Sequence, residues 1–94
     1  MEASAAIADC RSRRLAGQLP TYVASTQCVS PRIINAYQRA GYRYMDLVAD
    51  IEARRQEIAR QIDLNQITEA QAMARLNQFI DAMKVRERQR DAGR

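Results

Sequence analysis

Apolar residues recur at steps of three and four from residue 30 to residue 62, the spacing of one helix face. The recurring positions are Ile34, Tyr37, Gly41, Tyr44, Val48, Ile51, Ile58 and Ile62, with Ile33, Ala40 and Leu47 beside them. Ser30 is a good capping residue, and Pro31 suits the first helical position, where a missing N–H costs nothing. The pattern therefore predicts one long amphipathic helix over residues 31–62.

A second apolar stripe follows a polar turn at residues 63–67, where Asn65 is best suited to a left-handed backbone. Thr68 and Gln71 have the spacing of a capping box, which predicts a second helix over about residues 68–88. Its apolar positions are Met73, Leu76, Ile80 and Met83, with Ala72 and Phe79 beside them. The short connection predicts an all-α fold built on an antiparallel helical hairpin. Residues 85–94 are polar all round and are expected to form a frayed tail.

The first 29 residues carry a weaker pattern and are expected to form an N-terminal segment, residues 1–29, packed on the hairpin. Residues 3–16 are compatible with a short helix that stops before Gly17. Pro20 and the β-branched residues after it disfavour helix, so residues 18–29 are predicted to form a loop.

Antiparallel pairing sets a register that leaves part of the long helix uncovered. Val48 is placed opposite Met83, and Tyr44 then lies opposite Glu87, where the second helix has no further apolar residues. Two covers for the first third of the long helix stay open. One is the N-terminal segment, and the other is a second copy of the chain in a homodimer.

The uncovered part of the long helix contains the candidate interaction surface. Its members are Tyr37, Gly41, Tyr42, Tyr44 and Met45. Tyrosines are common anchors at protein interfaces, and a glycine on an apolar stripe allows another backbone to approach closely. The same tyrosines can instead pack along an edge of the domain.

Length and charge change this picture little. Ninety-four residues form one small domain, residues 1–94, with a net charge of +4. The candidate basic patch consists of Arg11, Arg13, Arg14, Lys84, Arg86, Arg88 and Arg90. Such a patch is typical of nucleic-acid binding, but Glu87 and Asp91 lie within it and weaken its field, so nucleic acid is disfavoured as a partner.

Cys10 and Cys28 are the only cysteines, and the chain has no histidine, which argues against a zinc site. The favoured interpretation is a disulfide formed in an oxidising compartment such as a periplasm. Two alternatives are free thiols in a cytoplasmic protein and lipid attachment at Cys10. Asp9 is a poor match to the small residue expected before a lipidated cysteine.

Catalytic chemistry has little support in this sequence. No Ser or Cys stands beside an evident base, and no phosphate-binding loop or EF-hand pattern is present. We therefore expect no enzyme activity, no cofactor and no metal. No apolar run has the length of a transmembrane helix, and the first residues lack the apolar core of a signal peptide.

The stretches LPTYVASTQCVSPRIINAYQRAGYRYMDLV (19–48) and IDLNQITEAQA (62–72) resemble small uncharacterised exported or lipoprotein-type proteins of alphaproteobacteria. The resemblance implies a periplasmic or envelope-associated location and no known activity. The function indicated is a non-catalytic protein-interaction or structural module of the cell envelope. The alternatives are a basic nucleic-acid-binding helical protein of the cytoplasm and a small periplasmic chaperone-like client binder.

Overall fold

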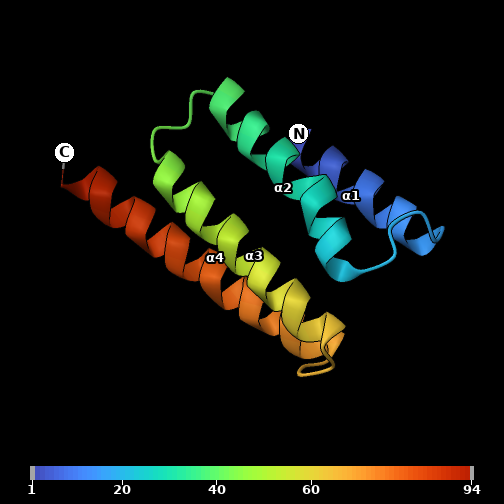
Figure 1. Ribbon diagram of the computed structural model, residues 1–94. Coiled ribbons are helices and arrows are strands. Elements are labelled where there is room, and N and C mark those ends of the chain that lie inside the picture. Colours follow the sequence, from blue (N-terminus) through green and yellow to red (C-terminus); the bar gives the residue numbers. More distant parts are fainter. Residues whose placement is uncertain (1, 94) are drawn as a thin grey trace.

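The computed structural model describes residues 2–93 and contains four α-helices that run up and down in chain order (Figure 1). Their bounds are α1 Glu2–Leu15, α2 Tyr22–Arg39, α3 Met45–Asp63 and α4 Glu69–Ala92. No strand occurs within residues 2–93, which confirms the predicted all-α class. The prediction of a loop-rich N-terminal segment is wrong, because α1 and the first half of α2 lie there.

The first three helices end in the same way, with a residue in the left-handed region. These residues are evenly spaced along the chain: Gly17 at φ 81°, Gly41 at φ 75° and Asn65 at φ 57°. The next residue in each case donates its N–H to a carbonyl five positions back. These bonds are Gln18 to Arg13 at 2.9 Å, Tyr42 to Tyr37 at 3.0 Å and Gln66 to Gln61 at 2.9 Å. This is the Schellman ending, and it satisfies carbonyls that the helix leaves open.

The predicted single helix over residues 31–62 is wrong, because residues 40–44 separate α2 from α3. Gly41 occupies a conformation that side chains rarely adopt, so it ends α2 instead of continuing a helix. No atom lies within 4 Å of the position where its Cβ would be, so no other backbone approaches it. The apolar spacing continues across the break because residues of both helices, including Tyr37 and Val48, pack on the same core.

α2 begins at Tyr22, inside the predicted loop, because its first amides find acceptors. The Thr21 hydroxyl oxygen accepts the Ala24 N–H at 3.0 Å. The Asp63 carboxylate, from the end of α3, accepts the N–H groups of Tyr22 and Val23 at 2.9 and 3.0 Å. A side chain distant in sequence therefore caps this helix end together with a local one.

Ser30 and Pro31 do not start a helix, and this prediction is also wrong. Pro31 lies inside α2. The Ser30 hydroxyl donates to the Glu52 carboxylate at 2.8 Å instead of capping a backbone amide. A Ser-Pro pair at a helix start and one inside a helix have the same local sequence, and tertiary contacts decide between them.

The start of α4 confirms the predicted capping box. The Thr68 hydroxyl oxygen accepts the Gln71 N–H at 3.1 Å, and the Gln71 side chain accepts the Thr68 N–H at 2.9 Å. The helix continues through Ala92, beyond the predicted end near residue 88. Arg86 and Arg90 pair with carboxylates of α3 and stabilise this polar end of α4 as helix.

α3 and α4 form the predicted antiparallel hairpin. Val48 and Met83, which the predicted register places opposite each other, line the same space between the helices. Tyr44 donates its hydroxyl hydrogen to Asp91, and Arg90 makes a two-point ion pair with Asp46, at 2.8 and 2.7 Å. These polar contacts hold a stretch of α4 that the apolar stripe does not reach.

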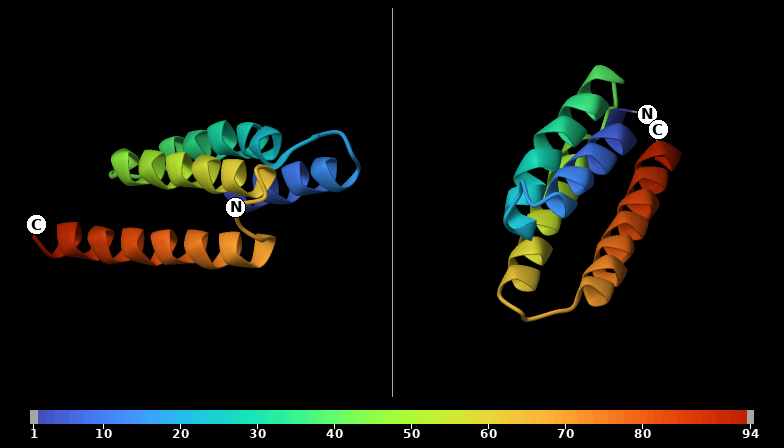
Figure 2. Two further views of the ribbon diagram at one scale, coloured as in Figure 1. Left: turned by 60° about the horizontal axis from the view of Figure 1, so that its bottom comes forward. Right: turned by 90° about the vertical axis from the view of Figure 1, so that its right-hand side faces the viewer.

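Each helix packs only on its neighbours in the chain: α1 on α2, α2 on α3, and α3 on α4. The shared core joins small residues of α1 to α2 and the start of α3, and consists of Ala3, Ala6, Cys10, Val29, Ile33, Ala36 and Val48. α1 thus covers α2, one of the two covers considered for this region. α1 and α4 do not pack on each other, and Figure 2 shows α4 standing apart from α1.

Candidate interaction groove

A groove runs between α1 and α4, and α2 and α3 form its floor. One part has a volume of about 300 Å³ and is lined by residues of all four helices, among them Ile7, Met73 and Leu76. A second part of about 210 Å³ continues along α4 past Ile80 and Met83. Ile7 and Arg55 line both parts, so the two parts adjoin each other. We call this feature the α1–α4 groove.

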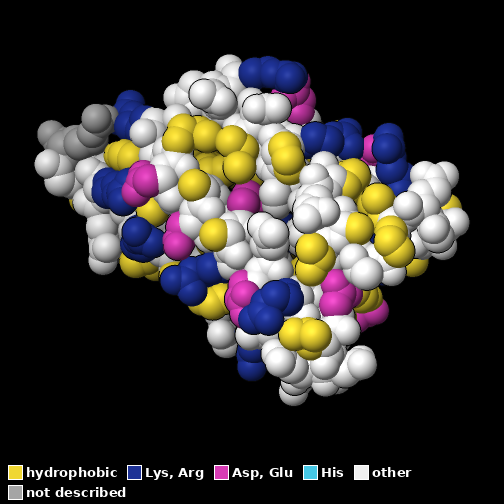
Figure 3. Space-filling model, in the orientation of Figure 1, with side chains coloured by type: hydrophobic (Ala, Val, Ile, Leu, Met, Phe, Trp, Pro, Cys, Tyr) yellow, Lys and Arg dark blue, Asp and Glu magenta, His cyan; other side chains and the backbone are white. Residues whose placement is uncertain are grey.

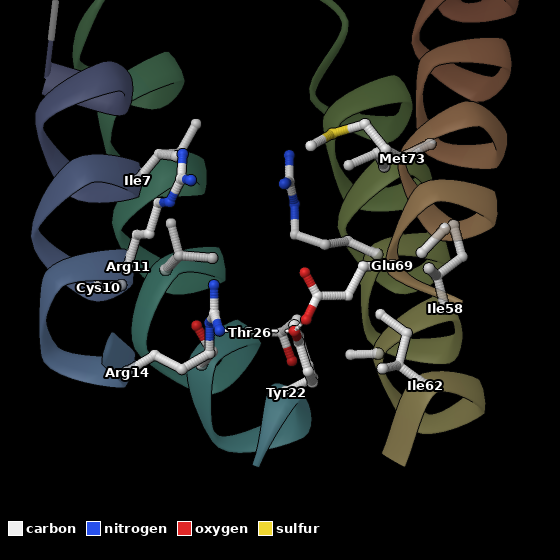
Figure 4. A pocket seen from close by; sticks show the side chains of 16 residues that line it. Ile7, Cys10, Arg11, Arg14, Tyr22, Thr26, Ile58, Ile62, Glu69 and Met73 are labelled. Atoms are coloured by element: carbon white, nitrogen blue, oxygen red, sulfur yellow. Dashed lines mark hydrogen bonds between the residues drawn. The ribbon is translucent and has the colours of Figure 1, made fainter. Parts of the chain in front are cut away.

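The groove exists because its two walls lack a direct contact. α1 lies close to α2 through the small side chains of Ala3 and Ala6, and Figure 4 shows Ile7 facing the gap from α1. Met73 faces the same gap from α4 and is 63% exposed, and Ile7 is 43% exposed. Apolar side chains of this size and exposure mark a surface whose burial by a partner lowers the free energy.

Two arginines of α1 extend over one end of the groove (Figure 4). The Arg14 guanidinium lies over the Tyr22 ring, 4.6 Å from its centre. Arg11 has no carboxylate partner among residues 2–93. Glu69 lies at the same end and accepts the hydroxyl hydrogen of Tyr22. The arginine end therefore presents donors that the described chain does not fully use.

The buried carboxylate of Glu52 lies in the floor of the groove. Glu52 is only 5% exposed and accepts hydrogen bonds from Arg55 Nε at 3.0 Å and from the Ser30 hydroxyl at 2.8 Å. Both bonds end on the Oε1 atom of Glu52. The bond from Arg55 is an ion pair within α3, and the bond from Ser30 joins α3 to α2, so the geometry is that of a structural group.

The residues of the sequence-predicted interaction surface are brought together at the α2–α3 connection, but most of them face inward. Tyr37, Tyr42 and Met45 pack against the core. The Tyr42 ring makes edge contacts with Tyr37 at 5.2 Å and Tyr44 at 5.9 Å between ring centres. Only Gly41 of the five is exposed. The cluster therefore packs the corner between α2 and α3.

The hydroxyl of Tyr42 is buried and has no hydrogen-bond partner within the described residues. Burial raises the pKa of Tyr42 to about 12, and the nearby Glu87 carboxylate adds to the effect. Tyr42 consequently stays neutral at physiological pH. A neutral phenol without a base that bonds it is a packing group, and catalysis by it has no support in this geometry.

The residues of the sequence-predicted basic patch do not come together. Arg11, Arg13 and Arg14 lie on α1, and Lys84, Arg86, Arg88 and Arg90 lie on α4, which α1 does not contact. Several are paired: Arg13 lies 3.2 Å from Asp9, and Arg90 lies 2.7 Å from Asp46. Figure 3 shows basic side chains interleaved with acidic ones on the face it displays. Such a surface lacks the single-sign field that attracts nucleic acid.

The sulfur atoms of Cys10 and Cys28 lie at disulfide distance, with their Cα atoms 5.9 Å apart. Cys10 is 1% exposed and lies between α1 and α2 at the edge of the groove. The pair therefore links the α1 wall to the groove floor.

The described part of the chain offers no group of three or more His, Cys, Asp or Glu side chains able to hold a metal ion. Within the same residues, no helix combines the length and hydropathy needed to cross a membrane.

Searches of protein-family models, curated proteins and solved structures found no match to this chain. Sequence reasoning missed the groove, although the apolar stripe of α4 from Met73 to Met83 was a visible sign of it.

Proposed function

We propose that this protein is a non-catalytic interaction module that binds an amphipathic helix of a partner protein in the α1–α4 groove. The observation that carries the proposal is a gap between two helices with apolar walls and a largely apolar floor that contains the Glu52–Arg55 ion pair. An amphipathic helix lays its apolar face into grooves of this kind. It would complete the packing that α1 and α4 leave unmade.

The chemistry of the α4 wall supports an adaptable binding surface. Met73 and Leu76 line the first part of the groove, and Ile80 and Met83 line the second part. Methionine is flexible and polarizable, so a wall containing it can adjust to partner side chains of different shape. This property also fits binding to several related helices.

Charge favours a partner of different sequence over a second copy of the chain. Arg11 and Arg14 stand at the rim of the groove, and the whole chain carries a charge of +4. The two helices that a second copy could offer from its own ends, α1 and α4, both finish in arginines. An acidic helix complements this rim, whereas a second basic chain is repelled by it.

An envelope location belongs to the same proposal. The disulfide-distance pair of Cys10 and Cys28 supports an oxidising compartment. The resemblance to exported proteins of alphaproteobacteria points the same way. We therefore propose that the partner helix is met outside the cytoplasm.

The test places a photoreactive p-benzoylphenylalanine at position 73 and, as a control, at position 78. Helical spacing puts Gln78 on the opposite face of α4 from Met73, and it is exposed. Irradiation in the native cell is expected to cross-link position 73 to a defined segment of another protein. Mass spectrometry identifies the segment, which is then synthesised as a peptide.

The affinity of this peptide for wild type and for two variants tests whether the groove is its binding site. We expect Met73→Glu to weaken binding by about tenfold or more, because it places an unpaired charge in an apolar contact. Gln78→Glu should change the affinity by less than about twofold. Equal binding by wild type and Met73→Glu contradicts the proposal. Cross-links to a lipid, to the chain itself or to many unrelated sequences contradict it as well, and the last result favours a chaperone-like role.

A further inference from the structure

The two ends of the α1–α4 groove differ in charge. At the first end, Arg11 and Arg14 project from the last turns of α1. At the other end, Ala3, Tyr37 and Met83 line the groove, and the charged groups that line this part are Glu52 and Arg55, which pair with each other. A bound helix therefore meets guanidinium groups of α1 at one end only.

The carboxylates near the arginine end already have donors. Glu69 accepts the Tyr22 hydroxyl hydrogen, and Asp63 accepts two backbone N–H groups at the start of α2. Neither is paired with Arg11 in the part of the chain that the structure describes. The guanidinium of Arg11 is thus left for an incoming acid, and Arg14 can turn one face of its fork to the same acid while it stacks on Tyr22.

The dipoles of α1 and α4 do not favour either orientation of a bound helix. α1 and α4 run in opposite directions, so a helix between them is parallel to one and antiparallel to the other. The two dipole interactions therefore oppose each other. The side-chain charges at the groove ends decide, together with the dipole of the bound helix, whose negative end is its C-terminus.

We infer that the bound helix is acidic in its last turn and lies parallel to α1, with that turn at Arg11 and Arg14 and its N-terminus toward Ala3 at the start of α1. This inference rests on the proposed function, because it assigns an orientation and a charge to the same occupant. In this orientation the acidic side chains and the negative helix end both meet guanidinium groups. The reverse orientation takes the acidic turn and the negative helix end away from Arg11 and Arg14 and leaves Arg11 without a partner.

The test uses two synthetic helical peptides of equal composition, each about as long as α1, which has 14 residues. Both carry leucines at the spacing of one helix face and amidated C-termini, and one hydrocarbon staple on the outer face equalises their helicity. One peptide has two glutamates in its last turn, and the other has them in its first turn. Fluorescence anisotropy gives the affinity of each for the oxidised, full-length protein.

The peptide with C-terminal glutamates is expected to bind about fivefold more tightly, the size of two partly exposed ion pairs. Arg11→Gln should reduce this preference to less than about twofold. Arg13→Gln is the matched control, because Arg13 pairs with Asp9 and does not line the groove, and it should leave the preference unchanged. Arg14 also stacks on Tyr22, so the affinity of Arg14→Gln is compared with wild type only if its circular-dichroism spectrum shows an unchanged fold.

The outcomes separate the inference from the function on which it rests. Equal affinity of the two peptides, or tighter binding of the peptide with N-terminal glutamates, overturns the inferred orientation. If binding remains sensitive to Met73→Glu in that case, the groove still binds a helix. If neither peptide binds, and the cross-linked segment from the cell does not bind either, both the orientation and the groove function are overturned.

Discussion

The two walls of the α1–α4 groove are held against the molecule in different ways. α1 buries three small residues, Ala3, Ala6 and Cys10, and is joined to α2 by the disulfide-distance pair. α4 is the longest helix, at 24 residues, yet the only residue it buries is Ala72. One wall is tightly seated and tied, whereas the other is long and shallowly packed.

The contacts that hold α4 are largely polar and exposed. Arg90 pairs with Asp46, and the Arg54 guanidinium lies 4.3 Å from the centre of the Phe79 ring. Exposed ion pairs contribute only about 0–1 kcal/mol each. The comparison therefore indicates that α4 is the wall that can open or shift to fit a partner, and that α1 provides the fixed side.

Breaking the tie of α1 should produce the largest effect. Reduction of the Cys10–Cys28 pair is expected to lower the free energy of unfolding by about 3 kcal/mol, because the unfolded chain gains conformational freedom. Urea unfolding with and without a dithiol reductant measures the change. Cys10→Ala with Cys28→Ala serves as the control and should not respond to reductant. An oxidised protein that unfolds at the same urea concentration as the reduced one contradicts the fixed-wall picture.

Weakening the start of α4 should have an intermediate effect. Thr68→Ala removes the hydroxyl that accepts the Gln71 N–H and is expected to cost about 1 kcal/mol. Amide hydrogen exchange should rise most in the first turns of α4, with little change in α1. Gln78→Ala, on the exposed face of the same helix, is the matched control. A uniform rise over all four helices would show that α4 does not open by itself.

The smallest effect is expected from the ion pair at the far end of α4. The Arg90 guanidinium bonds Asp46 and lowers the pKa of Asp46 from 3.8 to about 2. A carboxyl whose pKa is lower in the folded state stabilises the fold above its ordinary pKa and loses that contribution as pH falls toward the folded value. Stability should therefore decline between about pH 4 and pH 2.

Asp46→Asn is expected to remove part of that pH dependence and to speed amide exchange in the last turns of α4. Urea unfolding at several values of pH between 2 and 5 measures the first effect, with Asp81→Asn as the control. Asp81 makes no ion pair among the described residues. An Asp46→Asn variant with the same pH profile as wild type would show that this pair does not hold α4.

Local chemistry predicted the helix boundaries that depend on a few adjacent residues. The Thr68–Gln71 capping box, the left-handed Asn65 and the stop at Gly17 each follow from residue types within one turn. The break at Gly41 was missed because the apolar spacing runs through it unchanged. The even spacing of positions 17, 41 and 65 was the available sign that Gly41 also ends a helix.

Contacts between distant residues decided the rest, and the sequence pattern does not contain them. The start of α2 depends on the Asp63 carboxylate at the end of α3, and Ser30 donates to Glu52 instead of capping a helix. The groove itself arises because α1 seats on α2 through small residues while α4 packs only on α3. The missing α1–α4 contact cannot be predicted from an apolar stripe.

The strictly sequential packing of the four helices also has a consequence for folding kinetics. The helices pack against their neighbours in the chain, and the Tyr22–Glu69 hydrogen bond is a side-chain contact that joins the non-neighbours α2 and α4, so most contacts are local. Proteins with such local contacts fold on the order of milliseconds or faster. During synthesis, α1 and α2 can pair and bring Cys10 to Cys28 before α4 has emerged. The helices thus leave the ribosome in the order in which they are neighbours in the fold.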